Sequence, residues 1–201
     1  MESDHRLPGK TIPMNTQLNF RPATTADQPG IIDLVNRVYE EYGDRICLEE
    51  ADADLLDLQG FYLQPGGEFI VLEKTDSILG THALLPLADQ PGCCTFRRLY
   101  LDKSLRGESW GEQLMQWALE RAAARGFQRV EFWSDTRFER AHRFFQRLGF
   151  QPDGRVRQMT DGWIDYQEYF FSRPLDDISA TISNPQFDKA GENVDHDGTN
   201  G

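Results

Sequence analysis

The chain has 201 residues, of which 39% are hydrophobic and 27% are charged, and its formal net charge is −12. This mixture is typical of one soluble globular domain, and the apolar runs are too short and too often interrupted to cross a bilayer. The acidic net charge also argues against general binding of nucleic acids or of anionic membranes.

The cysteines and histidines form no metal-binding pattern. Cys47 stands alone, and Cys93 and Cys94 are adjacent, so they match neither a disulfide framework nor a zinc spacing. The four histidines are far apart in the chain: His5, His82, His142 and His196. The first ten residues contain no apolar signal segment. We therefore expect a cytoplasmic protein with reduced thiols and no metal.

Charge and composition divide the chain into one domain and two tails. Residues 1–16 and 176–201 are polar, lack periodicity and are expected to be disordered, and the second tail is acidic. Residues 17–175 are expected to form a single domain. Within the chain, residues 1–96 carry a net charge of −10, whereas residues 97–157 carry +5. A basic block inside an acidic protein favours a local anionic ligand, with a solvated charged surface as the alternative.

The predicted elements alternate between strands and helices along this domain. A short strand ends at Pro22, and Thr25 with Gln28 forms a capping-box pattern that begins a helix reaching Gly43. An acidic short helix follows at residues 48–63. Two strands are then joined by a tight turn near residues 76–77. The expected strands of this first half are residues 18–21, 68–74 and 78–87.

The second half begins with a strand that runs into a glycine-containing turn and a helix. Thr136 with Glu139 forms another capping-box pattern, which opens a helix that ends before Gly149. The expected strands of this half are residues 95–101, 129–133, 150–159 and 163–171. The order β-α-α-β-β-β-α-β-α-β-β predicts a mixed α/β domain.

The turn after the strand at residues 95–101 has the features of a phosphate-binding loop. The backbone N–H groups at a helix start lack intrahelical partners, and the helix dipole is positive there. Gly107 and Gly111 carry no Cβ, so a diphosphate could approach the backbone closely. A plain strand-to-helix turn is the alternative, because a loop with two glycines is by itself a weak signal.

Two segments of the chain resemble the GNAT superfamily of acyl-CoA-dependent N-acetyltransferases. Residues 106–111 are similar to its motif A loop, Q/R-x-x-G-x-G/A, except that Ser109 stands in place of the middle glycine. Residues 99–102, Leu-Tyr-Leu-Asp, resemble the L-Y-V-D strand end that precedes this loop in the family. Residues 141–150 are similar to motif B, A-x-x-L-Y-x-x-x-G-F. The resemblance covers about residues 18 to 175.

This resemblance implies a fold, a co-substrate and a set of binding residues. The implied fold is α/β, with a mixed, mostly antiparallel central sheet flanked by helices in a single domain. The implied co-substrate is acetyl-CoA, used without a metal, and its pantetheine amides pair with the fourth strand like an added strand. The implied cofactor-binding residues are Leu99, Tyr100, Leu101, Arg106, Gly107, Glu108, Ser109, Trp110, Gly111, Phe138, Ala141 and Phe145.

The usual proton-transfer residues of the family are missing. Phe145 stands where many members have a tyrosine that protonates the departing thiolate, and Thr95 stands where many have a glutamate base. An asparagine that often contacts pantetheine is replaced by Phe138. The remaining catalytic candidates are His142, His82, Glu131 and Tyr166. Each has a purely structural role as the alternative, and the sequence does not choose among them.

Two functions remain open from the sequence. The first is an N-acetyltransferase that moves an acetyl group from acetyl-CoA to a primary amine of a small molecule or peptide by direct attack. The second is a non-catalytic acyl-CoA-binding sensor or scaffold module, suggested by Thr95 and Phe145. The acidic segment 49–57, with Asp52, Asp54 and Asp57, suggests steering of a cationic acceptor such as a polyamine. A homodimer stays open, and neither nucleic acid nor membrane is expected as a partner.

Overall fold

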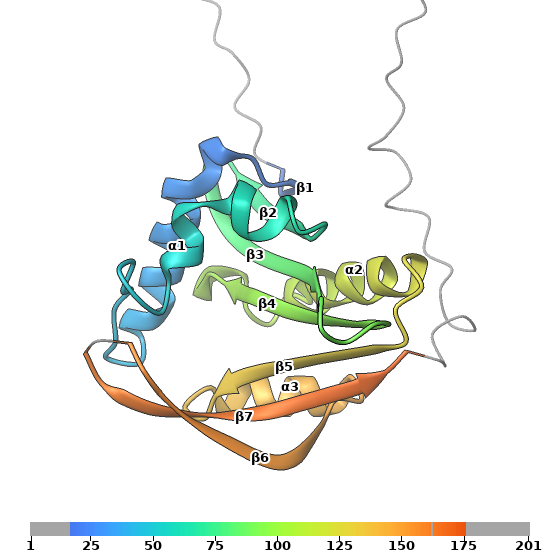
Figure 1. Ribbon diagram of the computed structural model, residues 1–201. Coiled ribbons are helices and arrows are strands. Elements are labelled where there is room, and N and C mark those ends of the chain that lie inside the picture. The colour runs from blue at the N-terminus through green and yellow to red at the C-terminus, as the bar shows by residue number, and fades with distance from the viewer. Residues whose placement is uncertain (1–16, 162, 176–201) are drawn as a thin grey trace, which may run out of the picture.

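Seven strands form one sheet in the order β1-β2-β3-β4-β5-β7-β6 (Figure 1). The computed structural model describes residues 17–161 and 163–175, so the two predicted tails lie outside the described residues. The strands are β1 (Asn19–Pro22), β2 (Glu68–Lys74), β3 (Ser77–Pro86), β4 (Cys93–Leu101), β5 (Arg129–Asp135), β6 (Gln151–Thr160) and β7 (Asp165–Pro174). The helices are α1 (Gln28–Glu40), α2 (Trp110–Ala124) and α3 (Glu139–Arg147). The predicted fold class, a mixed α/β sheet flanked by helices, is confirmed.

The sheet opens between β4 and β5. These two strands run parallel and pair only over Cys93–Thr95 and Arg129–Glu131, while the other neighbouring strands pair antiparallel. Beyond Thr95 the two strands diverge, as Figure 1 shows toward their carboxyl ends. Arg98 adopts a φ of 54°, a left-handed conformation that is rare for a residue other than glycine. This bend in β4 comes where the ladder to β5 has ended.

Alternating strand residues bury two apolar cores on opposite faces of the sheet. Phe69 and Val71 of β2 pack with α1, whereas Ile70 between them packs with α2. On β3, Leu84 belongs to the α2 core and its neighbours Ala83 and Leu85 belong to the α1 core. The sheet is thus covered by α1 on one face and by α2 and α3 on the other.

The acidic segment 48–63 is not the single helix that the sequence predicts. It forms a short 3-10 turn at Ala53–Leu56 and a π-helical turn at Gln59–Leu63. Asp52 is 1% exposed and Asp54 is 6% exposed, because both carboxylates turn inward to the guanidinium of Arg98. A solvated helical face would hold these side chains outward, so the buried ion pairs decide the local conformation here.

Both predicted capping boxes are wrong in position or in kind. The first capping box lies one residue earlier, where the Asp27 carboxylate accepts the Thr24 backbone N–H at 2.7 Å. It begins a 3-10 turn at Thr25–Asp27, and α1 follows this turn. At the second, Phe138 is the N-cap of α3 and makes no side-chain cap. Thr136 instead donates its N–H to the Gln167 carbonyl at 2.9 Å, because the chain is still following β7 there.

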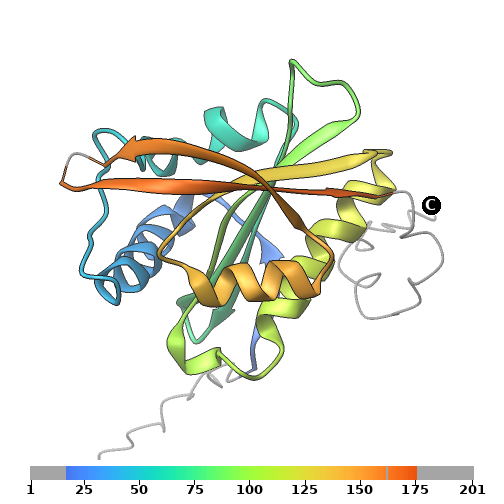
Figure 2. The same ribbon diagram turned by 90° about the horizontal axis from the view of Figure 1, so that it is seen from below.

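The long hairpin of β6 and β7 reaches back to the loop that follows α1. In Figure 2 this hairpin crosses the molecule in orange and red, and its end lies beside that loop. The contact includes the Arg45 guanidinium, which lies 3.2 Å from the centre of the Trp163 ring. Among residues 17–161 and 163–175, no helix is long and apolar enough to span a membrane.

Candidate active site

A groove of about 470 Å³ runs along the end of β4, over the loop before α2 and along α3. Its walls come from segments that are far apart in the sequence, because the sheet places β4 beside both helices. The lining residues are Val38, Tyr42, Leu99, Tyr100, Leu101, Arg106, Gly107, Ser109, Gly111, Glu112, Phe138, Arg140, Ala141, Arg143, Phe144, Phe145 and Arg147.

The loop before α2 presents backbone groups to this groove. Gly107 has a φ of +88°, and a Cβ added there would meet no atom within 4 Å. Ser109 is the N-cap of α2 and has a left-handed φ of 62° without a side-chain cap. The N–H groups of the first helical turn have no intrahelical acceptor, and the helix dipole makes this end positive. The loop can therefore receive an anion through its backbone.

Arg106 is held in the loop before α2 by hydrogen bonds of its own. Its guanidinium donates to both carboxylate oxygens of Glu41, at 2.5 and 2.8 Å, and to the Leu101 carbonyl at 3.0 and 3.1 Å. These bonds tie the loop to β4 and to the end of α1. Arg106 therefore holds the loop in shape, although its side chain also lines the groove.

The structure brings most of the predicted cofactor-binding residues together. All of them line the groove except Glu108, which is exposed, and Trp110, whose ring packs against Phe20 at 5.8 Å. Sequence reasoning missed a row of basic side chains on α3: Arg140, Arg143 and Arg147. Their spacing of three and four residues, inside the basic block, is the signal that could have found them.

We expect Ser109→Gly to stabilise the protein slightly and to leave acetyl-CoA affinity within tenfold of the wild type. The left-handed conformation costs a residue with a Cβ about 1–2 kcal/mol of folding free energy, and glycine avoids this cost. Part of the gain is lost again, because glycine gives up more conformational freedom when the chain folds. Thermal unfolding and titration with acetyl-CoA measure both effects. Ser109→Ala is the control, because it removes the hydroxyl and keeps the strained Cβ. An affinity loss above tenfold in Ser109→Gly would show that the serine hydroxyl binds the ligand.

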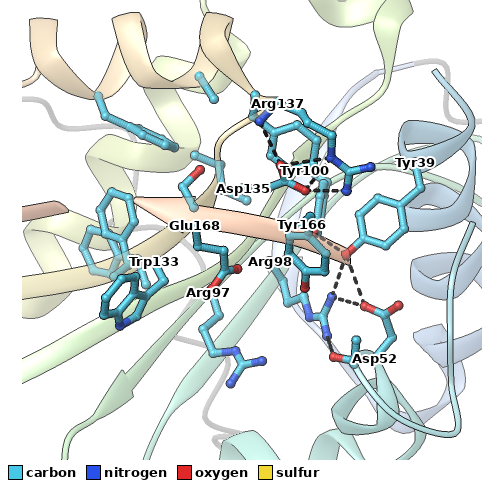
Figure 3. A pocket seen from close by; sticks show the side chains of 18 of the residues that line it. Tyr39, Asp52, Arg97, Arg98, Tyr100, Trp133, Asp135, Arg137, Tyr166 and Glu168 are labelled. Atoms are coloured by element: carbon cyan, nitrogen blue, oxygen red, sulfur yellow. Dashed lines mark hydrogen bonds and ion pairs between the residues drawn. The ribbon is translucent and has the colours of Figure 1, made fainter. Parts of the chain in front are cut away.

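A second, smaller cavity of about 140 Å³ adjoins the groove where β4 and β5 separate. The two share one wall, made of Leu99, Tyr100, Phe138, Ala141 and Phe145. Figure 3 shows that the charged and aromatic side chains of this cavity come from α1 and the segment after it, from β4, from β5 and the loop after it, and from β7. The groove and the cavity therefore meet at the opening of the sheet.

A buried polar cluster forms one side of this cavity. The guanidinium of Arg98 donates to Asp52 Oδ1 at 2.6 Å (Figure 3). It also donates to both carboxylate oxygens of Asp54. Tyr39 donates to Asp52 at 3.2 Å and accepts from Tyr100, whose hydroxyl oxygen is 3.0 Å away. Burial opposes a charge on Asp54, but the bonds and charge of Arg98 outweigh it and lower the pKa of that carboxyl.

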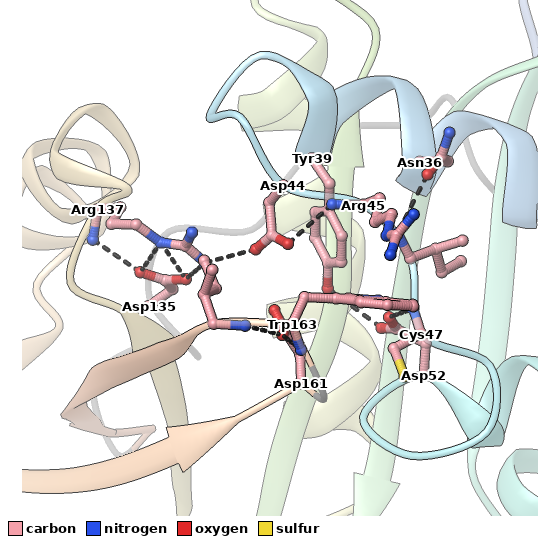
Figure 4. Close-up of polar contacts among 12 residues, drawn as sticks. Asn36, Tyr39, Asp44, Arg45, Cys47, Asp52, Asp135, Arg137, Asp161 and Trp163 are labelled. Carbon is pink, nitrogen blue, oxygen red and sulfur yellow. Dashed lines mark hydrogen bonds and ion pairs between the residues drawn. The ribbon is translucent and has the colours of Figure 1, made fainter.

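A second polar cluster closes the opposite end of the cavity. The Arg137 guanidinium donates to Asp135, at 2.5 to 3.0 Å, and to Asp44 at 2.8 Å (Figure 4). Asp161 accepts the backbone N–H groups of Trp163 and Ile164, at 2.8 and 3.0 Å. All three carboxylates are buried. One guanidinium therefore faces three carboxylates at this end.

Two of the four predicted catalytic candidates do not line the groove or the cavity. His142 Nε2 lies 3.2 Å from Oγ of Ser134, a residue that lines the cavity, and the His142 ring contacts Phe171. Glu131 lies on the paired part of β5, where it accepts from Gln90 and pairs with Arg129, each at 2.9 Å. These contacts favour structural roles for both side chains, and their catalytic roles stay predictions.

The other two candidates, His82 and Tyr166, line the cavity. His82 is fully buried, and its Nδ1 donates to the Leu114 carbonyl at 3.0 Å, which leaves Nε2 without a partner among the described residues. Burial lowers the pKa of His82 to about 4. Burial, with nearby carboxylates such as Glu168, raises the pKa of Tyr166, so this phenol stays protonated. The described residues contain no group of histidine, cysteine and acidic side chains placed to hold a metal.

Residues 31–150 match the family model of the acetyltransferase (GNAT) family, and this match covers more than half of the chain. The chain belongs to the GNAT acetyltransferase family. The predicted family is thereby confirmed, and membership of an acyltransferase family decides for an enzyme against a non-catalytic module.

Curated relatives carry N-acetyltransferase names. An uncharacterized N-acetyltransferase of Escherichia coli K12, YjgM, is 27% identical over 137 residues, which cover 66% of this chain and 81% of the relative. N-acetyltransferase 8F1 of Rattus norvegicus is 28% identical over 133 residues, which cover 65% of this chain. The matched part spans 58% of the length of the rat protein.

Solved structures share the fold of this GNAT acetyltransferase. A GNAT-family acetyltransferase of Staphylococcus aureus Mu50 has a TM-score of 0.65 and 17% identity, over 79% of this chain and 99% of that one. The acetyltransferase yncA of Salmonella typhimurium, solved with acetyl-CoA, has a TM-score of 0.60 and 16% identity, over 80% and 95%. These identities are low, so the likeness shows the fold.

Proposed function

We propose that this enzyme transfers an acetyl group from acetyl-CoA to a primary amine by direct attack. The observation that carries the proposal is the meeting of the groove and the cavity at the opening between β4 and β5. A long ligand in the groove and a small one in the cavity would touch each other at the shared wall. Acetyl-CoA would supply the activated acyl group there.

The residues of the groove fit the chemistry of acetyl-CoA. The backbone N–H groups at the start of α2 suit a diphosphate, and neither Gly107 nor Gly111 places a Cβ in its way. Arg140, Arg143 and Arg147 add positive charge along α3. The end of β4 beyond Thr95 has no β5 partner, so its backbone can pair with the amides of pantetheine like an added strand.

Tyr166 is the proton donor that we assign to the departing thiolate. It lines the cavity, it keeps its proton at neutral pH, and Phe145 at the shared wall has no proton to give. His82 receives no proton-transfer step, because a pKa of about 4 makes it a weak base at pH 7. The acceptor amine loses its proton to water or to a cavity carboxylate.

Release of free thiol from acetyl-CoA tests this function. The protein is mixed with acetyl-CoA and a panel of amino acids, amino amides, polyamines, aminoglycosides and peptides, and thiol is detected over time. We expect acetyl-CoA to raise the melting temperature and at least one primary amine to release thiol. Binding of acetyl-CoA without release by any amine would contradict the proposed acetyl transfer.

We expect Tyr166→Phe to lower kcat at least tenfold without changing acetyl-CoA affinity. A positioned proton donor contributes about 10²–10⁴-fold to a rate, and water can replace part of it when a thiolate leaves. The matched control is Tyr169→Phe, because Tyr169 lies on the same strand, is 40% exposed and packs beside His142 instead of in the cavity. Equal kcat values for Tyr166→Phe and Tyr169→Phe would remove the assignment.

A further inference from the structure

Arg97 is a cationic residue of the cavity between β4 and β5, and its own ion pair within the protein is weak. Its side chain is 38% exposed and lines the cavity. Within residues 17–161 and 163–175 its one ion pair joins Nη2 to Asp54 Oδ2 at 3.9 Å, too far for a hydrogen bond. The planar guanidinium therefore keeps its N–H donors available for a ligand.

The carboxylates beside Arg97 already have stronger partners. Asp54 receives the Nε and Nη2 groups of Arg98 and the hydroxyl of Tyr62, and Asp52 receives Arg98 Nη1. Arg98 therefore holds both carboxylates inward, and its single charge balances one of the two. This burial argues against Asp52 and Asp54 as surface charges that steer a cationic acceptor.

The position of Arg97 suits contact with a small anion. Figure 3 shows its guanidinium between the side of Trp133 and Glu168 and the side of Arg98 and Asp52. Its Cζ lies over the ring of Phe61, 5.2 Å from the ring centre. An aromatic contact on the face of a guanidinium leaves its N–H edge free to bind a carboxylate with two parallel bonds.

The carboxylate cluster around Arg137 would attract an ammonium group into the same cavity. Arg137 faces three buried carboxylates there, Asp44, Asp135 and Asp161, so that this end carries excess negative charge. The cavity measures about 140 Å³, and a water needs roughly 10–15 Å³ of such volume. The space therefore holds on the order of ten water-sized atoms, which is the size of an amino acid.

We propose that the acceptor is a small aminocarboxylate, of the size of a free amino acid, whose carboxylate binds Arg97. This inference rests on the proposed acetyl transfer and names its acceptor class. The amine nitrogen forms the new bond to the acetyl carbon as the carbon–sulfur bond breaks. The ammonium first loses one proton to water or to a cavity carboxylate. The nitrogen loses a second proton as the amide forms, and the thiolate takes up one proton, so the products are an N-acetyl amino acid, free CoA and one released proton.

Matched acceptors test the carboxylate directly. The purified full chain is assayed for thiol release with each of the common amino acids, with its α-amide and with the decarboxylated amine. At least one amino acid should exceed its own amide in kcat/KM by 10- to 100-fold, the effect of a charge-assisted hydrogen bond. The proposal is overturned if the amide or the decarboxylated amine reaches the kcat/KM of its amino acid in every case. It is also overturned if no amino acid is acetylated.

Variants then assign the effect to Arg97. Arg97→Gln should lower the ratio of kcat/KM for the amino acid over its amide at least tenfold, mainly through KM, and Arg97→Lys should restore part of it. Arg121→Gln is the control, because Arg121 pairs with Glu68 on the exposed side of α2. A ratio unchanged in Arg97→Gln overturns the inference. The proposed function is tested separately by the melting temperature of the wild type with and without acetyl-CoA. A melting temperature that acetyl-CoA does not raise would overturn the proposed function.

Discussion

Gly111→Asp should fold as stably as the wild type and bind acetyl-CoA at least 100-fold more weakly. Gly111 lies in the first turn of α2, and a Cβ added there would meet only Leu101 Cδ2, at an ordinary 3.9 Å. An acidic residue in the first turn of a helix also interacts favourably with the helix dipole. The same carboxylate would repel a diphosphate at the loop, so binding and stability should separate.

Calorimetric titration with acetyl-CoA and thermal unfolding measure the two effects of Gly111→Asp. Gly111→Asn is the matched control, because it adds a side chain of the same shape without the charge. We expect Gly111→Asn to lose much less affinity than Gly111→Asp. Equal affinity of the wild type and Gly111→Asp would show that the diphosphate does not bind at the start of α2.

Arg98→Gln should destabilise the protein by about 3–5 kcal/mol, because it leaves two buried carboxylates without a countercharge. The side chains of Arg98, Asp52 and Asp54 are 5%, 1% and 3% exposed, so water cannot replace the lost partner. At roughly 2–4 °C per kcal/mol for a chain of this size, the melting temperature should fall by about 6–20 °C. Arg121→Gln, which breaks the exposed pair with Glu68, should change stability by about 1 kcal/mol at most.

The pH dependence of Arg98→Gln gives a second measurement of the same ion pairs. In the wild type the pKa of Asp54 lies below its unfolded value of 3.8. Its contribution to stability is therefore present above pH 3.8 and is lost as the pH falls below that value. In Arg98→Gln, burial without a cation should raise the pKa of Asp54. Lowering the pH toward 4 should therefore reduce the difference in free energy of unfolding between the variant and the wild type. A difference independent of pH would contradict the ion pairs.

Local patterns of the sequence determined the elements that depend on near neighbours. The tight turn between β2 and β3 was predicted near residues 76–77, and Thr75 and Asp76 take the left-handed φ values that such a turn needs. The spacing of Gly107 and Gly111 placed the loop before α2, because strand, turn and helix start follow one another directly. The alternation of helices and strands followed from the same short-range signals, apart from the helix expected at residues 48–63, whereas the mostly antiparallel sheet was implied by the resemblance to the GNAT superfamily.

Contacts between distant segments decided the parts that the sequence alone did not. His142 and Phe145 are three residues apart on α3 and both rings contact Phe171, yet only Phe145 lines the cavity, because the packing of α3 against the sheet sets which atoms reach the opening. Asp54 looks like a surface acid in the sequence, but Arg98, 44 residues later, draws it into the interior. Periodicity tells which residues share a face of an element. It does not tell which partner that face meets, because the partner comes from the assembly of the whole sheet.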